Sequence, residues 1–238
     1  MLDTKGNRIT YYGHSTFSLT TPSGQVALID PWLIANPKCP ESLKKVARLD
    51  AIFLSHAHSD HFGDTFDLAK QHHPRIFAIY ETAEYIAENG FQKEVTGMGK
   101  GGTQTAGDFQ ITLTHAFHSN SIDTLNPPRY AGEPAGLIIR MPGGFTIYHA
   151  GDTAVFGDMK LIGEIYKPDL AMLPIGDLYT MEPREAAYAI RLLGVEHVIP
   201  MHYATFPALT GTPEALRKET QDIPNLTIHA LKPGESLS

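Results

Sequence analysis

Four imidazole and carboxylate side chains lie within six residues of this chain. The group follows an apolar run at residues 51–54 and consists of His56, His58, Asp60 and His61. Side chains two apart in extended backbone point the same way, so His56 and His58 can face one ion while Asp60 and His61 turn toward a neighbouring one. Buried imidazole and carboxylate groups need partners, and an exposed cluster would have no reason for this spacing. The segment therefore predicts a metal site in a loop at the end of a buried strand.

Three further candidate ligands, His118, Asp152 and His202, each come a few residues after a predicted strand. A lone histidine at such a position is more often a hydrogen-bonded packing residue. Together with the first group, however, they place seven ligand side chains at strand ends, where a rigid scaffold presents functional loops. We therefore expect all seven to contribute to one site.

Short apolar runs predict the strands and helices. The expected strands are at residues 9–19, 25–29, 51–54, 76–79, 109–114, 137–140, 145–148, 170–173, 195–199 and 226–230. The expected helices are at residues 65–72, 82–89, 156–165, 183–193 and 213–220, and the expected loops at 97–102 and 121–133. The early strands follow one another closely and the later ones alternate with helices, which favours sheets packed together with helices outside over a simple doubly wound sheet.

Composition limits the class of protein. Apolar side chains make up 42% of the 238 residues, enough for a sizeable core, and we expect one domain over residues 1–238. The formal charge of −7, without a run of Lys and Arg, makes nucleic acid an unlikely partner. Cys39 is the single cysteine, which excludes an intrachain disulfide. The first ten residues are polar, so we expect no signal peptide, no membrane span and a cytoplasmic location, with a homo-oligomer left open.

The ligand motifs resemble those of the metallo-β-lactamase superfamily. His56-X-His58-X-Asp60-His61 is followed by His118, by Gly151-Asp152-Thr153 and by His202, and Asp30 matches the acidic residue that precedes these motifs in the family. The stretches at residues 12–15, 148–153, 173–177 and 200–203 further resemble one branch, the metal-dependent hydrolases related to L-ascorbate-6-phosphate lactonase. The similarity extends from about Ile9 to Pro207.

The resemblance implies an α/β fold (α+β in some schemes), a four-layer αββα sandwich with its site at one edge. It also implies a first metal ion held by His56, His58 and His118, a second held by Asp60, His61 and His202, and Asp152 as a bridge between them. Imidazole and carboxylate ligands suit zinc, our leading choice for the two divalent ions, and the same set accepts manganese, iron or nickel.

This site predicts a metal-dependent hydrolase in which a hydroxide bridging the two ions is the nucleophile, because bound dications make water acidic and polarise the scissile group. Asp60 would orient the hydroxide as a catalytic residue, and Asp30 would fix a ligand imidazole through its second nitrogen. His14, in the opening turn, is predicted as a proton donor or substrate contact, with a structural role as the equal alternative. His149 is a candidate for supporting a ligand, and His115 is expected to be structural.

The preferred substrate is a small ester, lactone or phosphoester. One alternative is a phosphodiesterase acting on nucleotides, nucleic acid or phospholipid headgroups, and another is a metal-binding regulatory protein without turnover. Arg129, Lys160 and Arg184 are candidates for a phosphate contact, although solvated surface charge is the simpler interpretation. Asp177 and Thr180 are predicted to border the pocket, and Glu182 departs from the glycine common in the branch.

Overall fold

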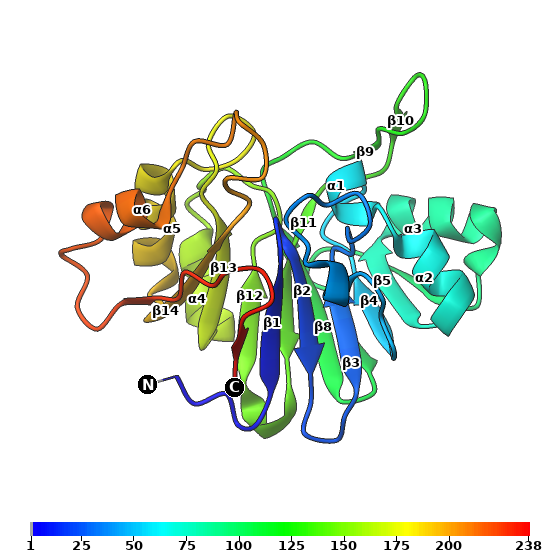
Figure 1. Cartoon of the computed structure of the whole chain (residues 1–238), viewed down its shortest axis with the longest axis horizontal. Coiled ribbons are helices and arrows are strands. Elements are labelled where there is room, and N and C mark those ends of the chain that lie inside the picture. The colour runs from blue at the N-terminus through cyan, green and yellow to red at the C-terminus, as the bar shows by residue number, and fades with distance from the viewer. Residues whose placement is uncertain (1) are drawn as a thin grey trace.

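Short strands build two seven-stranded sheets that face each other (Figure 1). The structure, a computed structural model, describes residues 2–238. The first sheet has the order β16-β1-β2-β3-β4-β5-β6 and contains β1 (Arg8–Gly13), β2 (Thr16–Thr20), β3 (Val26–Ile29), β4 (Ala51–Phe53), β5 (Arg75–Ile79), β6 (Val95–Met98) and β16 (Ser236–Leu237). The second has the order β15-β14-β13-β12-β11-β8-β7 and contains β7 (Thr103–Ala106), β8 (Phe109–His115), β11 (Ala135–Arg140), β12 (Thr146–His149), β13 (Leu170–Pro174), β14 (His197–Met201) and β15 (Thr227–Ile228).

Helices cover the outer face of each sheet. Beside the first sheet lie α1 (Ser59–Phe62), α2 (Thr65–His72), α3 (Tyr80–Ile86) and the π-helical turn η2 (Ala87–Phe91); beside the second lie α4 (Met159–Tyr166), α5 (Pro183–Leu193) and α6 (Pro213–Glu219). The remaining short elements are η1 (Glu41–Leu43), η3 (Pro142–Gly144) and the pair β9 (Ser121–Ile122) and β10 (Arg129–Tyr130). No helix within residues 2–238 has the length and apolarity needed to cross a membrane.

Alternation along the strands divides the buried residues into three cores. In β4, Phe53 faces the core between the two sheets, whereas Ile52 faces the core beneath α2 and α3. In β12, Ile147 lies in the central core and Tyr148 in the core beneath α4 and α5. This period of two residues buries both faces of each sheet. The layers are therefore helix, sheet, sheet and helix, and the predicted αββα sandwich is confirmed.

Parallel pairing brings the functional loops to one edge. Strands β3 to β6 are parallel to one another in the first sheet, as are β12 to β15 in the second. Loops that follow parallel strands leave a sheet at the same edge. The loops after β4, β12 and β14 consequently gather at the upper edge in Figure 1.

Two expectations about the early chain were wrong. The predicted strand at residues 9–19 is the antiparallel pair β1 and β2, because Gly13 (φ 101°) and His14 (φ 60°) reverse the chain. The predicted helix at 82–89 begins earlier, at Tyr80, and its α-helical part ends at Ile86 before the π-helical turn, in which Gly90 has a φ of 99°.

Several edge strands were not predicted, namely β6, β7, β9, β10 and β16. The loop expected at residues 97–102 overlaps the end of β6, and the loop expected at 121–133 contains β9 and β10. These strands are short, and in β7 three of the four residues are exposed, so they carry no alternating apolar signal.

Candidate metal centre

Six of the predicted ligands form two groups of converging ring nitrogens and carboxylate oxygens. Ligand atoms of His56, His58 and His118 lie within 4.8 Å of one another. Nε2 of His56 is 3.0 Å from Nδ1 of His58, a close approach of two ring nitrogens. His56 and His58 come from the loop after β4, and His118 comes from the loop after β8. This group has the three nitrogen ligands predicted for the first ion.

The second group contains Asp60, His61 and His202, and the structure adds His14 to it. Oδ2 of Asp60 is 3.9 Å from Nε2 of His202, and Oδ1 of Asp60 is 3.9 Å from Nε2 of His61. Asp60 and His61 lie in the short helix α1, directly after the extended His56–His58 segment. The turn into this helix separates Asp60 and His61 from His56 and His58.

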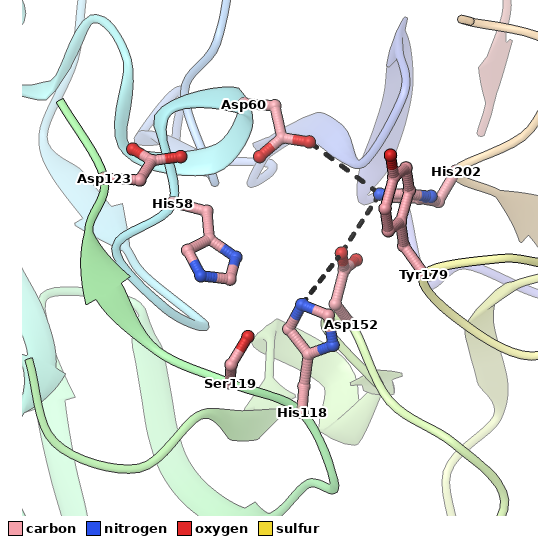
Figure 2. Close-up of a pocket in the computed structure, with 8 residues that line it drawn as sticks. All are labelled: His58, Asp60, His118, Ser119, Asp123, Asp152, Tyr179 and His202. Atoms are coloured by element: carbon pink, nitrogen blue, oxygen red, sulfur yellow. Dashed lines mark ion pairs between the residues drawn. The ribbon is translucent and has the colours of Figure 1, made fainter. Parts of the chain in front are cut away.

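Asp152 lies between the two groups (Figure 2). Its Oδ2 is 3.0 Å from Nε2 of His202 and 3.7 Å from Nε2 of His118, and its Oδ1 is 3.4 Å from Nε2 of His61. One carboxylate thus reaches histidines of both groups, the position that a bridging ligand needs.

Several buried polar atoms of the centre make close ionic contacts but no well-oriented hydrogen bond within residues 2–238. They are Nε2 of His61, Oδ1 of Asp152 and both ring nitrogens of His202. Leaving a buried polar group unpaired costs about 1–3 kcal/mol, and a coordinated cation removes that cost for the nitrogen or oxygen atoms that it binds. The donor set, with three or more imidazoles and carboxylates, is also one that divalent transition metals accept. The residues present therefore fit a metal centre.

The charges within the centre are strongly coupled. Burial opposes protonation of His61, but the carboxylates of Asp152 and Asp60 raise the pKa of its imidazole well above the ordinary value. Burial likewise opposes ionisation of Asp152, but the histidines His202 and His61 lower the pKa of its carboxyl well below the ordinary value.

Asp30 contacts His61 of the second group. It is fully buried, and its Oδ1 accepts a hydrogen bond from the backbone N–H of Ser55 (2.7 Å). Its Oδ2 accepts one from the Ser55 hydroxyl (2.6 Å) and lies 2.9 Å from Nδ1 of His61. A carboxylate can only accept, so Nδ1 of His61 carries a proton and Nε2 faces the centre. Asp30 thus has the supporting contact that the sequence predicts for it.

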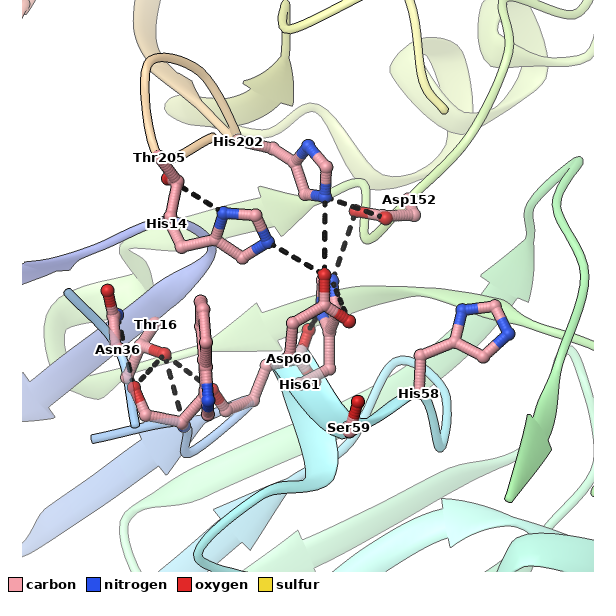
Figure 3. A network of polar contacts seen from close by, with 12 residues as sticks. His14, Thr16, Asn36, His58, Ser59, Asp60, His61, Asp152, His202 and Thr205 are labelled. Atoms are coloured by element: carbon pink, nitrogen blue, oxygen red, sulfur yellow. Dashed lines mark hydrogen bonds and ion pairs between the residues drawn. The ribbon is translucent and has the colours of Figure 1, made fainter. Parts of the chain in front are cut away.

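His14 reaches the second group from the turn between β1 and β2 (Figure 3). Its Nε2 is 3.1 Å from Oδ2 of Asp60 and its Nδ1 is 2.9 Å from the Thr205 hydroxyl. Burial, and next the neighbouring His202, lower the pKa of His14 to about 4, so its ring is neutral at pH 7. Because the carboxylate only accepts, the single proton sits on Nε2 and the Thr205 hydroxyl donates to Nδ1. The side chain is fully buried and does not line the pocket.

A pocket of about 250 Å³ opens onto the two groups. Its lining residues are His58, Asp60, His118, Ser119, Asp123, Asp152, Tyr179 and His202. Sequence reasoning missed three of them, Ser119, Asp123 and Tyr179, because none belongs to a ligand motif. Asp123 accepts hydrogen bonds from the backbone N–H (3.0 Å) and hydroxyl (3.1 Å) of Ser59, at the start of α1.

Asp177 and Thr180, which were predicted to border the pocket, flank its lining residue Tyr179 without lining it themselves. Glu182, in place of the expected glycine, forms a capping box with Glu185 at the start of α5. The three candidate phosphate contacts are on the surface: Arg129 pairs with Glu88, Lys160 pairs with Glu164, and Arg184 lies exposed in α5.

Two further histidines, His149 and His115, lie outside both groups. His149 is fully buried, with Nε2 3.0 Å from the Ser15 carbonyl oxygen. His115 is 3.1 Å from the Lys100 ammonium, outside the centre. Neither belongs to the groups that could hold an ion within the described part of the chain.

Comparisons with known proteins place these features in a family. Residues 26–203 match the beta-lactamase superfamily domain. The UPF0173 metal-dependent hydrolase of Rubrobacter xylanophilus is 51% identical over 234 residues, which cover 98% of this chain and 96% of the relative. That of Koribacter versatilis is 46% identical over the full length of both chains. Among solved structures, a metallo hydrolase from Ignicoccus hospitalis is similar with a TM-score of 0.85 and 35% identity, covering 97% of each chain.

Proposed function

The chain belongs to the metallo-β-lactamase superfamily as a metal-dependent hydrolase, and we propose that it uses two divalent ions to cleave a small ester, lactone or phosphoester. One observation carries the proposal. Two groups of ligand atoms converge on either side of Asp152, directly beneath an open pocket. The alternative of a metal-binding regulatory protein without turnover does not agree with membership among these hydrolases.

We assign the first ion to His56, His58 and His118 and the second to Asp60, His61 and His202, with Asp152 contacting both. The distances from Asp152 to histidines of both groups support the bridging assignment. Zinc remains the leading choice, because it accepts mixed imidazole and carboxylate ligands, although manganese, iron or nickel would suit the same atoms.

When bound, two such ions supply a water molecule acidic enough to attack near neutral pH, and they polarise the scissile carbonyl or phosphoryl group. The chain's own contribution is positioning. Asp30 holds His61, and Asp60 is held by the Nε2–H group of His14, which is itself anchored by Thr205. With His14 in place, Asp60 can orient the reacting water from a fixed direction. Direct contact between His14 and the substrate stays a prediction.

The charge of the pocket favours esters and lactones over phosphodiesters. Among residues 2–238, no Lys or Arg side chain lines the pocket, whereas three carboxylates do. Phosphoryl substrates are usually held by additional cationic side chains. A relation to L-ascorbate-6-phosphate lactonase is compatible with lactone cleavage and remains part of the proposal, as do the cytoplasmic location and any homo-oligomer.

A screen of the zinc-loaded protein tests this function. We expect hydrolysis of p-nitrophenyl acetate or of a γ-lactone to exceed that of bis(p-nitrophenyl) phosphate, and we expect chelation or Asp152→Ala to abolish it. Turnover of the phosphodiester alone would favour the phosphodiesterase alternative. A fully metal-loaded protein that cleaves none of the three classes would overturn the proposal.

A further inference from the structure

Among residues 2–238, Tyr179 is the one Phe, Tyr or Trp side chain that lines the pocket (Figure 2). Five of the eight lining residues are proposed metal ligands, and Asp123 is engaged with Ser59. This leaves Ser119 and Tyr179 for contact with a bound molecule. The side chain of Tyr179 is 58% exposed, so most of its surface is free to be covered.

The backbone before Tyr179 adopts an unfavourable conformation. Asp177 has a φ of 70° and Leu178 a φ of 51°, both in the left-handed region. Such a conformation costs of order 1–3 kcal/mol for a residue like leucine, persists only where the surroundings enforce it, and occurs often at ligand clamps. Here the Leu178 N–H donates to Oδ1 of Asp177 (2.7 Å), the Tyr179 N–H donates to the Asp177 carbonyl (2.6 Å), and the Asp177 N–H donates to the Met181 carbonyl (3.0 Å).

The base of this loop is fixed against the chain that carries His202. A Cβ atom on Gly176 would lie 2.0 Å from the His202 carbonyl oxygen, and one on Gly211 would lie 1.6 Å from the Ile175 carbonyl oxygen. The Gly211 N–H also donates to the Gly176 carbonyl (3.3 Å). Only glycine permits these backbone approaches. The position of Tyr179 is therefore tied to that of a proposed metal ligand.

The charge around Tyr179 indicates what it contacts. Two divalent ions would be nearly balanced by the three lining carboxylates, and no lining cation among residues 2–238 would hold an anionic substituent. The exposed ring of Tyr179 instead offers an apolar surface. Aromatic faces of this kind gain free energy by covering apolar carbon.

We propose that Tyr179 determines specificity by packing its ring against the acyl chain of a neutral ester or lactone, an inference that rests on the proposed function. The loop of residues 176–181 holds the ring beside the scissile carbonyl. Substrates whose acyl chain is long enough to reach the ring would then be preferred over acetyl compounds.

Turnover of esters with different acyl lengths is the first arm of the test. We expect the zinc-loaded protein to prefer p-nitrophenyl hexanoate over p-nitrophenyl acetate in kcat/KM, and we expect Tyr179→Ala to reduce that preference about tenfold. Tyr179→Phe should keep it, because the ring is retained. The matched control is Tyr188→Ala, an exposed tyrosine in α5, which should behave as the wild type. An equal loss in Tyr179→Phe would assign the effect to the hydroxyl group and contradict the packing role.

Binding without turnover is the second arm. Acetohydroxamic and hexanohydroxamic acids share the same metal-chelating head group and differ only in acyl length, and calorimetry gives their affinities directly. We expect the hexanoyl compound to bind about tenfold more tightly to the wild type and this ratio to vanish in Tyr179→Ala. If the affinities differ in this way but no ester is cleaved, the proposed hydrolysis is contradicted and the role of Tyr179 in binding is supported. Equal affinities in the wild type, or an unchanged ratio in Tyr179→Ala, would overturn the inference even if esters are cleaved.

Discussion

His14 links the turn between β1 and β2 to the proposed second metal ion. Its backbone carbonyl accepts a hydrogen bond from the His202 N–H (2.8 Å), while its ring contacts Asp60 and Thr205. Its ligand atom also lies within 4.8 Å of those of the second group. The side chain can therefore position Asp60 or coordinate an ion itself, and these two roles give different results on substitution.

We predict that His14→Ala keeps two ions per chain and lowers kcat by about 10²-fold, because Asp60 loses the contact that positions it. Thr205→Val, which keeps the ring and removes its anchor, should cause a smaller loss. Metal analysis and turnover measured on the same samples decide the matter. Loss of one ion in His14→Ala would make His14 a ligand, and unchanged turnover would make it purely structural.

His149 gives a pH-dependent prediction. Its Nδ1 accepts a hydrogen bond from the Gly151 N–H (3.2 Å), its Nε2 faces the Ser15 carbonyl, and burial lowers the pKa of its ring below the ordinary 6.5. Below pH 6.5 the unfolded chain binds a proton here before the folded chain does, so the free energy of unfolding falls as the pH falls. Above about pH 6.5 both states are neutral and the group adds no pH dependence.

We therefore expect His149→Gln to flatten the pH dependence of unfolding of the metal-free protein below pH 6.5. The change in slope is at most one proton, or about 1.4 kcal/mol per pH unit. Urea unfolding between pH 5 and 7 measures it. An unchanged slope in the variant would show that His149 is protonated in the folded state as readily as in the unfolded chain.

The sequence indicated the residues whose ligand atoms converge better than it indicated the residues around them. Asp60 and His61 belong to a motif whose residue types and spacing are readable in one dimension. Tyr179 and Thr205 carry no such signal, because they come to the site only through the loops after β13 and β14. Their proximity depends on tertiary contacts that a single sequence does not reveal.

At the scale of the elements, α4 and α5 show how close packing depends on one residue. Gly163 in α4 faces the end of α5, where a Cβ atom would lie 2.1 Å from the Leu193 carbonyl oxygen. At Gly157, just before α4, no atom of residues 2–238 beyond its two chain neighbours lies within 4 Å of the Cβ position. Gly157 is the control position for Gly163, because only Gly163 lies where α4 contacts the end of α5.

We predict that Gly163→Ala lowers the free energy of unfolding by about 1–3 kcal/mol, the usual cost of overpacking. Gly157→Ala should be neutral or stabilise by about 0.4–1 kcal/mol, since alanine restricts the unfolded chain. Urea titrations of both variants provide the comparison. Equal stabilities would contradict the packing of α4 against α5.

Predictions of elements succeeded where apolar periodicity was strong. The helices at residues 65–72 and 183–193 have the predicted bounds, because proline and capping residues mark the start of α5 and a regular apolar face extends along it. The error at 9–19 arose because both halves of that run favour strand, and only the backbone at Gly13 and His14 reverses it. The weak edge strands owe their pairing to neighbours rather than to their own residues.

At the scale of the whole molecule, the site depends on both sheets. The first sheet supplies His14, Asp60 and their neighbours, whereas the second supplies Asp152 and His202. The core between the sheets holds them together, for example where the Phe53 and Phe109 rings lie 5.8 Å apart. This shared core supports the prediction of one domain over residues 1–238, which stays a prediction.

The number of metal ions bound per chain tests the proposed dinuclear centre. Elemental analysis of protein saturated with zinc and freed of excess metal should give about two ions, because the ligands form two groups around one carboxylate. Asp152→Ala should reduce occupancy at both positions, whereas His202→Ala should mainly reduce the second. Finding no ion after reconstitution with zinc, manganese and nickel, or loss of the same single ion in both variants, would contradict the dinuclear centre.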